Sequence, residues 1–378
     1  MGSCQGIHFS TICKVYIPGH KPACLPGVAL LTFMTRKFTV FSGFALIPGL
    51  RIKDEMVLDL GTSNTVITSG KQPRILREPS RILLDRALSG LPLPQKSSDA
   101  KQALASKVWV RPVESGKVVN VYAMEQLLKP LLAETSRGLR ALTMRRVVGL
   151  LVSPFLNEEE RSHARALLVD LGFSKIHLIE APFAAANGAG LDVSSATGQA
   201  IVDLGGGTTK TSVFSMGGLV NWHEEPVGGR SFDHAIGEYL RARYGVDVPP
   251  GLGEKIKLSI GSLHPKDKPE RFSFPGTERV SRLPRKVTLD DNEVRDVMTD
   301  TFEGFLRGIM KGLEALPPEL AGDIARQGIV LVGGGALVPG MADYLQERIG
   351  LSFRMANDPM NTTVLGARAM LRNGLNSG

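Results

Sequence analysis

Two short segments of the chain have nearly the same sequence, and both are rich in residue types that bind phosphate. The first, residues 59–65, reads DLGTSNT, and the second, residues 203–209, reads DLGGGTT. Glycines let the backbone approach a phosphate closely, and successive N–H groups in a turn form an anion-binding nest. The aspartate that begins each segment, Asp59 or Asp203, can hold a divalent metal ion, usually through water. One such segment alone is typical of an ordinary hairpin turn, but two of them predict a pair of turns with a nucleoside triphosphate between them.

The residues on either side of each segment predict β-strands. Apolar residues 56–58 (MVL) and 200–202 (AIV) precede the two segments, and residues 66–68 (VIT) and 210–214 (KTSVF) follow them. Each segment is therefore expected to form a strand, a glycine turn and a second strand. The residues expected to bind the phosphates and their metal ion are Asp59, Gly61, Thr62, Ser63, Asn64, Asp203, Gly205, Gly206, Gly207 and Thr208.

From residue 56 onward, predicted strands alternate with predicted helices, which implies an α/β fold. Because the phosphate turn occurs twice, we expect two related lobes with a cleft between them. Lobe I would comprise residues 56–198 and 356–378, with a small subdomain inserted at about 84–108, and lobe II residues 199–355, with an insertion at about 225–290. The remaining strands are expected at 146–152, 175–180, 271–288, 328–332 and near 353, and the helices at 123–138, 157–172, 182–190, 231–244, 253–260, 290–316, 341–349 and 362–372.

The positive charge of the chain is concentrated near its start. The 378 residues carry a formal net charge of +8, but residues 1–53 contain six lysines and arginines and no acidic residue. The remainder carries only +2, so the charge does not indicate a nucleic-acid-binding protein. All three cysteines, Cys4, Cys13 and Cys24, lie in the same segment. The rest of the chain has neither a disulfide framework nor a thiolate metal site, which agrees with a reducing, cytoplasmic setting.

Residues 1–55 form an atypical leader with two apolar stretches, at 24–34 and 38–50. Neither reaches the roughly 20 apolar residues that a membrane-spanning helix needs. Three interpretations are open. The translation start could be assigned too far upstream, with Met34 as the real start; residues 34–53 could contact a membrane through apolar and basic side chains; or the segment could be a secretory signal. The first two are favoured, because a nucleotide-dependent protein belongs where the nucleotide is.

The order of these motifs resembles the actin/Hsp70/sugar-kinase ATPase superfamily and, within it, the bacterial actin-like MreB family. The two glycine turns are similar to the family's two phosphate loops, and residues 329–337 (IVLVGGGAL) are similar to its adenosine motif. Residues 254–257 (EKIK) and 260–262 (IGS) resemble its helix that holds adenine and ribose. Shorter matches are residues 78–80 (EPS), 111–112 (RP), 178–180 (LIE), 189–191 (AGL) and 276–286. The resemblance covers roughly residues 56–372 in the family's order.

The resemblance implies an actin-like ATPase fold, with duplicated RNase H-like units of sheet and helix around a nucleotide cleft. It implies ATP or GTP as the cofactor, with Mg²⁺ near Asp59 and Asp203. The residues that it assigns to the nucleoside are Glu254, Lys255, Ile256, Lys257, Gly333, Gly334, Gly335 and Ala336. Two plainer interpretations stay open: Glu254 and Lys257 share a helix face and could form a solvated ion pair, and the three glycines could form a tight connection that needs a positive φ.

The chain departs from the family where the two lobes join. The MreB family usually has Glu-Glu-Pro here, and the glutamate directly before the proline aligns the attacking water. This chain reads Glu180-Ala181-Pro182, so the expected carboxylate is missing at Ala181. General base catalysis is worth about 10²–10⁴ in rate, so we expect slow hydrolysis unless Glu180, Thr208 or Thr209 takes over.

The resemblance implies a cytoskeletal protein in the cytoplasm that forms filaments of its own copies at the inner face of the plasma membrane. Its partners would be the membrane surface and membrane-bound cell-wall elongation proteins, and its role would be to organise wall synthesis and set cell shape. Three alternatives remain. A small-molecule kinase would need a catalytic base that the sequence does not clearly offer, and an Hsp70-type chaperone would need a further domain after residue 372. A nucleotide-gated adaptor without hydrolysis is kept open by Ala181.

Overall fold

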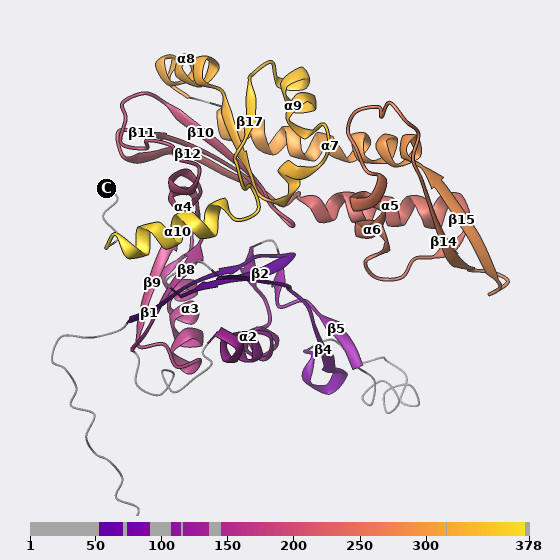
Figure 1. The fold of residues 1–378 in the computed structure, drawn as a ribbon, viewed down its shortest axis with the longest axis horizontal. Helices are drawn as coiled ribbons and strands as arrows, with labels where there is room; N and C mark the ends of the chain where they lie inside the picture. The colour runs from indigo at the N-terminus through magenta and orange to yellow at the C-terminus, as the bar shows by residue number, and fades with distance from the viewer. Residues whose placement is uncertain are drawn as a thin grey trace, which may run out of the picture. The chain divides into compact units, whose positions relative to one another are not determined.

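Two five-stranded sheets with the same strand order form the centre of the fold (Figure 1). The computed structural model describes residues 53–70, 74–90, 107–114, 116–135, 145–314 and 316–374. The predicted leader therefore lies almost wholly outside the described residues, as does most of the insertion predicted at about 84–108.

Sheet I has the order β3-β2-β1-β8-β9 and sheet II the order β12-β11-β10-β16-β17. In each sheet the first three strands pair with one another antiparallel, and the last two strands run parallel to the third, central strand. The strands of sheet I are β1 (Lys53–Leu60), β2 (Asn64–Ser69), β3 (Arg74–Pro79), β8 (Arg145–Val152) and β9 (Lys175–Glu180). Those of sheet II are β10 (Gln199–Leu204), β11 (Thr209–Ser215), β12 (Gly218–Glu225), β16 (Ile329–Val332) and β17 (Phe353–Met355). The shared order is that of a duplicated unit, as the paired turns predict.

Helices cover the outer face of each sheet. Sheet I packs against α2 (Val121–Thr135) and α3 (Glu158–Asp170). Sheet II packs against α5 (Gly229–Tyr244), α7 (Asp291–Leu313), α8 (Pro318–Gln327) and α9 (Met341–Ile349). Both α3 and α7 begin with a capping box, at Asn157 and Asp290, in which the cap side chain and the third helical residue satisfy each other's backbone N–H groups.

Smaller elements stand beside the two sheets. They are the pairs β4 (Ile82–Asp85) with β5 (Lys107–Val110) and β6 (Val113–Glu114) with β7 (Lys117–Val118), the sheet of β13 (Val246–Asp247), β14 (Arg271–Glu278) and β15 (Pro284–Asp290), the helix α6 (Leu252–Ile260), and the 3₁₀ turns η1 (Arg86–Leu88) and η3 (Gly334–Leu337). None of the helices that the structure describes is both long and apolar enough to cross a membrane.

Two helices, α4 (Ala181–Gly188) and α10 (Thr362–Arg372), lie between the sheets (Figure 1). Ala184 packs into the cluster with sheet I and α10, whereas Ala185 and Ala186 pack against sheet II. The two helices cross at glycines. A Cβ atom on Gly366 would stand 1.9 Å from the Ala184 carbonyl oxygen, and one on Gly188 would stand 2.0 Å from the Thr362 carbonyl oxygen. The glycines therefore allow a backbone contact at the connection between the sheets.

The structure differs from the sequence prediction at several elements, among them the short strands β4, β5, β6, β7 and β13, which were not predicted. Helix α7 ends at Leu313 rather than near residue 316, and α8 was not predicted at all. Pro318 begins α8, because a proline at the first helical position loses no hydrogen bond. Strand β12 was missed because it is an edge strand whose polar residues conceal the β pattern. The predicted boundaries of the two lobes stay a prediction.

Candidate functional site

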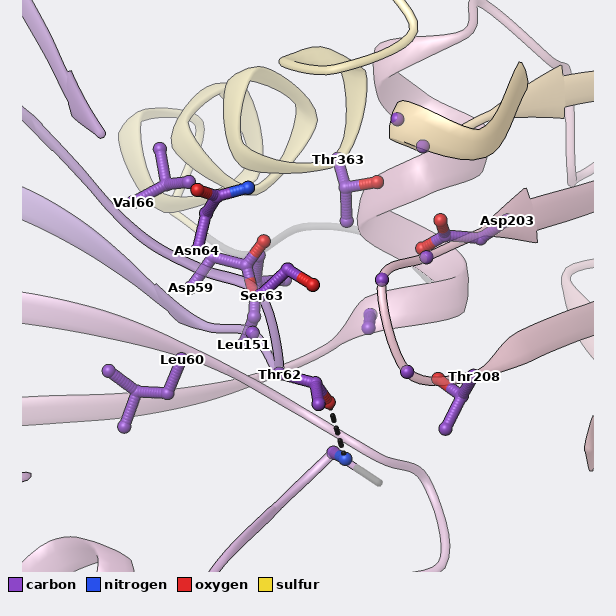
Figure 2. A pocket seen from close by; sticks show the side chains of 18 of the residues that line it. Asp59, Leu60, Thr62, Ser63, Asn64, Val66, Leu151, Asp203, Thr208 and Thr363 are labelled. Carbon is purple, nitrogen blue, oxygen red and sulfur yellow. Dashed lines mark hydrogen bonds between the residues drawn. The ribbon is translucent and has the colours of Figure 1, made fainter. Parts of the chain in front are cut away.

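The two glycine turns face each other across a cavity of about 840 Å³ (Figure 2). The first turn joins β1 to β2 in sheet I, and the second joins β10 to β11 in sheet II. A Cβ atom on Gly206 would stand 2.1 Å from the Ser63 Oγ, and one on Gly207 would stand 2.5 Å from the Thr62 Cγ2. These two glycines are therefore needed for the approach of the turns themselves, as well as for any phosphate between them.

Ser80 and Gly116 hold the first turn in place. The Ser80 hydroxyl donates to the Gly61 carbonyl at 2.6 Å, and the Ser80 N–H donates to the Ser63 carbonyl at 2.8 Å. On the other side of the turn, the Gly116 N–H donates to the Thr62 Oγ1 at 3.1 Å. The EPS motif at residues 78–80 thus has a structural role that its sequence did not reveal.

The start of α5 holds the second turn. The N–H groups of Gly229 and Arg230 donate to the carbonyls of Gly205 and Gly206, each at 2.9 Å. These two hydrogen bonds to the first residues of α5 hold the second turn in place. Thr208 is buried and lines the cavity. Because the turn is already ordered, it can bind an anion without the entropy cost of ordering its backbone.

Three carboxylates and one ammonium group line the cavity on the side of the two glycine turns: Asp59, Asp203, Glu224 and Lys210. Burial raises the pKa of Asp59 to about 6; Lys210 and Arg77 oppose this rise and Asp203 adds to it. Burial also raises the pKa of Asp203, against the influence of Lys210. For Lys210 burial favours the neutral amine, but Asp203, Glu224 and Asp59 outweigh it and raise its pKa. Lys210 is therefore a charged ammonium in this site.

Asp59 and Asp203 suit a magnesium ion that arrives with a nucleotide. Mg²⁺ usually takes one or two carboxylates from the protein and completes its shell with phosphate oxygens and water. Within the described ranges of the chain, no group of three or more His, Cys, Asp or Glu side chains could hold a metal ion by itself. The two aspartates therefore fit a metal ion shared with phosphates better than a metal ion held by the protein alone.

The opposite end of the cavity is lined by α6, α5 and the turn after β16. Glu254 and Lys257 both line it, but they do not pair with each other. The Lys257 ammonium lies 2.7 Å from the Asp233 carboxylate and donates to the Gly229 carbonyl at 2.9 Å. Since Lys257 is held by α5, the Glu254 side chain is left to face the cavity.

The three glycines after β16 differ in whether the fold itself requires a glycine at their position. Gly333 has a φ of 83°, and its Cβ would stand 2.4 Å from the Asp203 Oδ1. A Cβ on Gly335 would stand 2.8 Å from the Leu204 Cβ. A Cβ on Gly334 would meet no heavy atom of the described residues within 4 Å, and Gly334 has no positive φ, yet it lines the cavity. The fold accounts for Gly333 and Gly335, but not for Gly334.

Five of the predicted site residues do not line the cavity. The Thr209 hydroxyl donates to the Val227 carbonyl at 2.8 Å, so it is directed to a backbone group. Ile256 and Ala336 are buried in the core of sheet II, and the Lys255 ammonium lies 5.8 Å from the centre of the Phe272 ring. The fifth is Glu180. The other predicted site residues line the cavity: Asp59, Gly61, Thr62, Ser63, Asn64, Asp203, Gly205, Gly206, Gly207, Thr208, Glu254, Lys257, Gly333, Gly334 and Gly335.

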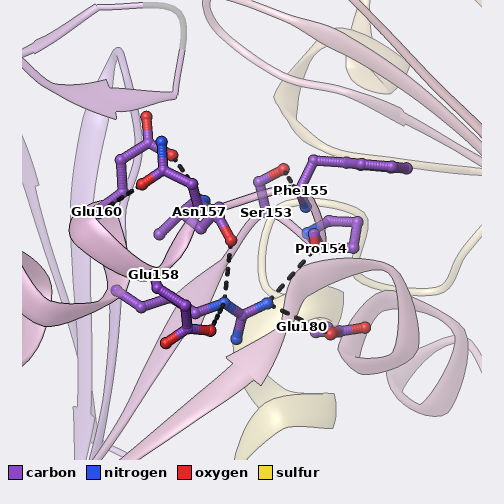
Figure 3. A network of polar contacts seen from close by, with 9 residues as sticks. Ser153, Pro154, Phe155, Asn157, Glu158, Glu160 and Glu180 are labelled. Atoms are coloured by element: carbon purple, nitrogen blue, oxygen red, sulfur yellow. Dashed lines mark hydrogen bonds and ion pairs between the residues drawn. The ribbon is translucent and has the colours of Figure 1, made fainter.

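Glu180 belongs to a polar network around Arg161 (Figure 3). The Arg161 Nη2 lies 3.8 Å from the Glu180 Oε1 and donates to the Pro154 carbonyl at 3.4 Å, while its Nε donates to the Leu156 carbonyl at 3.0 Å. Strand β9 ends at Glu180 and α4 begins at Ala181, which lines the cavity. The side chain at the cleft is therefore a methyl group, and the neighbouring carboxylate is directed to α3.

Sequence reasoning missed Lys210, Asp233, Arg77 and Ser80, which line the cavity or support it. A signal existed for Lys210, because it lies opposite Asp203 in a hairpin that the sequence predicts. Asp233 and Arg77 reach the site from a helix and an outer strand, and no local pattern indicates their approach.

Comparisons with known proteins agree with the geometry. The sequence model of the family described as MreB/Mbl protein matches residues 53–376. The chain is 35% identical over 319 residues to the cell shape-determining protein MreB of Escherichia coli strain K12, with 83% of this chain and 92% of that protein covered. It is 29% identical to the cell shape-determining protein Mbl of Bacillus subtilis strain 168, with 84% and 95% covered.

A solved structure matches over nearly the same part of the chain. MreB5 of Spiroplasma citri bound to ADP has a TM-score of 0.75 and 27% identity, and the match covers 87% of this chain and 100% of that one. The expected actin-like fold is confirmed by this match together with the two equivalent sheets. The chain belongs to the MreB/Mbl family.

Proposed function

We propose that the chain is a nucleotide-binding, actin-like cytoskeletal protein that assembles into filaments and takes part in setting cell shape. The observation that carries the nucleotide part is the cavity between two contacting glycine turns, with Asp59 and Asp203 beside it. MreB5 of Spiroplasma citri, which shares the fold, has been seen with ADP and with AMPPNP. ATP or GTP with Mg²⁺ is the cofactor that this cavity would take.

Gly334 supports a nucleoside at the other end of the cavity. Among the residues that the structure describes, none obstructs a side chain at this position, since no heavy atom lies within 4 Å of where a Cβ would stand. A flat base that lies against the backbone would account for the glycine. The variant Gly334→Ala should therefore fold normally but bind nucleotide about 10-fold more weakly or worse, since overpacking costs about 1–3 kcal/mol.

Filament assembly tests the proposed function. Purified protein would be incubated with ATP, GTP, ADP or no nucleotide, and polymer would be measured by sedimentation and by negative-stain electron microscopy. We expect polymer with a triphosphate, and less polymer for Gly334→Ala at the same concentration. Gly322→Ala on α8 is the matched control, because its Cβ would meet only the flexible end of Arg326, at 3.4 Å. Failure of the wild type to bind any nucleotide or to polymerise would reject the proposal.

We further propose that the protein hydrolyses its nucleotide slowly. Ala181 lines the cavity at the start of α4 and cannot accept a hydrogen bond from an attacking water, while Glu180 faces Arg161. The variant Ala181→Glu should raise phosphate release under polymerising conditions by about 10²-fold or more. Equal, rapid release by the wild type and the variant would contradict this proposal. Polymer without phosphate release in both proteins would favour a nucleotide-gated assembly or adaptor.

Attachment to the inner membrane surface and a role in wall synthesis are also proposed. The support is the name of the family's relatives as cell shape-determining proteins and the apolar, basic sequence at 34–53. Co-sedimentation with anionic vesicles should exceed that with neutral vesicles, because four lysines and arginines lie in that range. A chain that begins at residue 51, which lacks the apolar stretch and two of the four basic residues, would serve as the control, and equal binding by both chains would contradict a role for residues 34–50.

A further inference from the structure

Lys210 lies in a row of charged residues across sheet II. In the register of the sheet, Lys210 on β11 is directly opposite Asp203 on β10 and directly opposite Glu224 on β12. Directly opposed residues of antiparallel strands project from the same face of a sheet. All three residues line the cavity, on the side of the second glycine turn. The row therefore places one positive charge between two negative charges at the phosphate end of the site.

The lysines that line the cavity differ in what holds them. The Lys117 ammonium lies 3.1 Å from the Glu160 carboxylate, and the Lys257 ammonium lies 2.7 Å from the Asp233 carboxylate. For Lys210, no carboxylate oxygen lies within the 4.0 Å of an ion pair in the part of the chain that the structure describes. The attraction of Asp203, Glu224 and Asp59 therefore acts on Lys210 from a distance, and its three N–H donors stay available to a ligand.

A half-buried ammonium with free donors beside a glycine turn matches the chemistry of a phosphate group. Lysine binds phosphate as a point charge, and a hydrogen bond between two ionised groups is about twice as strong as a neutral one. The glycine turn supplies N–H groups, but Asp59, Asp203 and Glu224 would repel a triphosphate. A fixed positive charge in the same place offsets part of that repulsion before any metal ion arrives.

We propose that Lys210 is a nucleotide-binding residue whose ammonium contacts the terminal phosphates and supplies part of the charge that a divalent cation would otherwise supply. The proposal rests on the proposed function, since it deepens the description of the same site. Its consequence is that a nucleoside triphosphate binds to this chain with an unusually small dependence on Mg²⁺.

The test is equilibrium binding of a fluorescent ATP analogue to the full chain, once with Mg²⁺ and once with EDTA. In EDTA the wild type should bind within about 10-fold of its affinity in Mg²⁺. Lys210→Met should bind about 10- to 100-fold more weakly than the wild type in EDTA, the range for a charge-assisted hydrogen bond, and should lose less in Mg²⁺. Lys210→Arg, which keeps the charge, should recover most of the loss. Lys129→Met on α2, an exposed lysine that does not line the cavity, is the matched control.

Several results would overturn the proposal. Equal affinities of the wild type and Lys210→Met in EDTA would reject it, as would a wild type that binds only when Mg²⁺ is present. A wild type that binds under neither condition would reject the proposed function as well, so the two failures can be told apart. If Lys210→Met lacks a cooperative thermal transition, Glu224→Gln decides instead. Removal of that negative charge should strengthen binding in EDTA, and unchanged or weaker binding would reject the proposal.

Discussion

A single methyl group at Gly366 should disrupt the contact between α4 and α10. A Cβ on Gly366 would stand 1.9 Å from the Ala184 carbonyl oxygen and 2.5 Å from the Gly188 backbone nitrogen. Both are backbone atoms, so no side chain can turn away, and the two helices would have to separate by more than 1 Å. Overpacking costs about 1–3 kcal/mol, and a rigid backbone contact should reach the upper end of that range.

The expected loss is partly offset by helix propensity. Alanine stabilises a helix interior by about 0.5–1 kcal/mol relative to glycine. The net cost of Gly366→Ala should therefore be about 2 kcal/mol or more. At about 2–4 °C per kcal/mol, the midpoint of thermal unfolding should fall by about 4 °C or more. Gly322→Ala, also inside a helix but with only an arginine side-chain end nearby, should raise the midpoint by about 1–4 °C.

Circular dichroism at 222 nm during heating, with urea unfolding as a second measure, would compare the two variants with the wild type. The sign of the difference is the decisive result. If Gly366→Ala unfolds at the same temperature as Gly322→Ala, the two helices do not cross at these glycines, and the account of the connection between the sheets is wrong. A lower unfolding temperature for Gly366→Ala alone would support the crossing of α4 and α10 at these glycines.

Two further variants probe the polar contacts beside the cleft. Arg161→Gln should lower the free energy of unfolding by about 1–3 kcal/mol, because the charged Arg161 donates hydrogen bonds to the Pro154 and Leu156 carbonyls that the variant loses. Urea unfolding would measure the difference, and an unchanged free energy of unfolding would contradict the prediction. Lys257→Met should lower the free energy of unfolding by about 3 kcal/mol, since it leaves the Asp233 carboxylate without its partner. The double variant with Asp233→Asn should recover part of that loss. If the effects of the two substitutions simply add, the two side chains do not interact.

The elements that the sequence predicted well are those with local signals. The strands around Asp59 and Asp203 follow from apolar runs that end in glycine turns. Helix α3 follows from its cap, Asn157, and from three glutamates in its first turn. These signals are short in sequence, so no knowledge of tertiary packing is needed to detect them.

The contacts that the sequence did not predict join distant segments. The crossing of α4 and α10 brings Gly188 and Gly366 together, and each glycine alone suggests only a weak helix. Strand β12 was missed because Glu224 and Glu225 conceal its β pattern. Consequently the row of Asp203, Lys210 and Glu224 could not be predicted, although Lys210 itself lies directly after the second turn.

The polar contacts at the start of α4 indicate that a small movement of Glu180 cannot replace the carboxylate that is missing at Ala181. Its carboxylate faces Arg161, whose guanidinium is also held by two backbone carbonyls of the segment after β8. Release of Glu180 from Arg161 would still leave its Cα at the end of β9, one residue before the position that lines the cavity. We therefore expect Arg161→Gln to destabilise the fold without accelerating phosphate release, whereas Ala181→Glu should accelerate release with little effect on the network. Faster release by Arg161→Gln would show instead that Glu180 can reach the water, and that Arg161 restrains it.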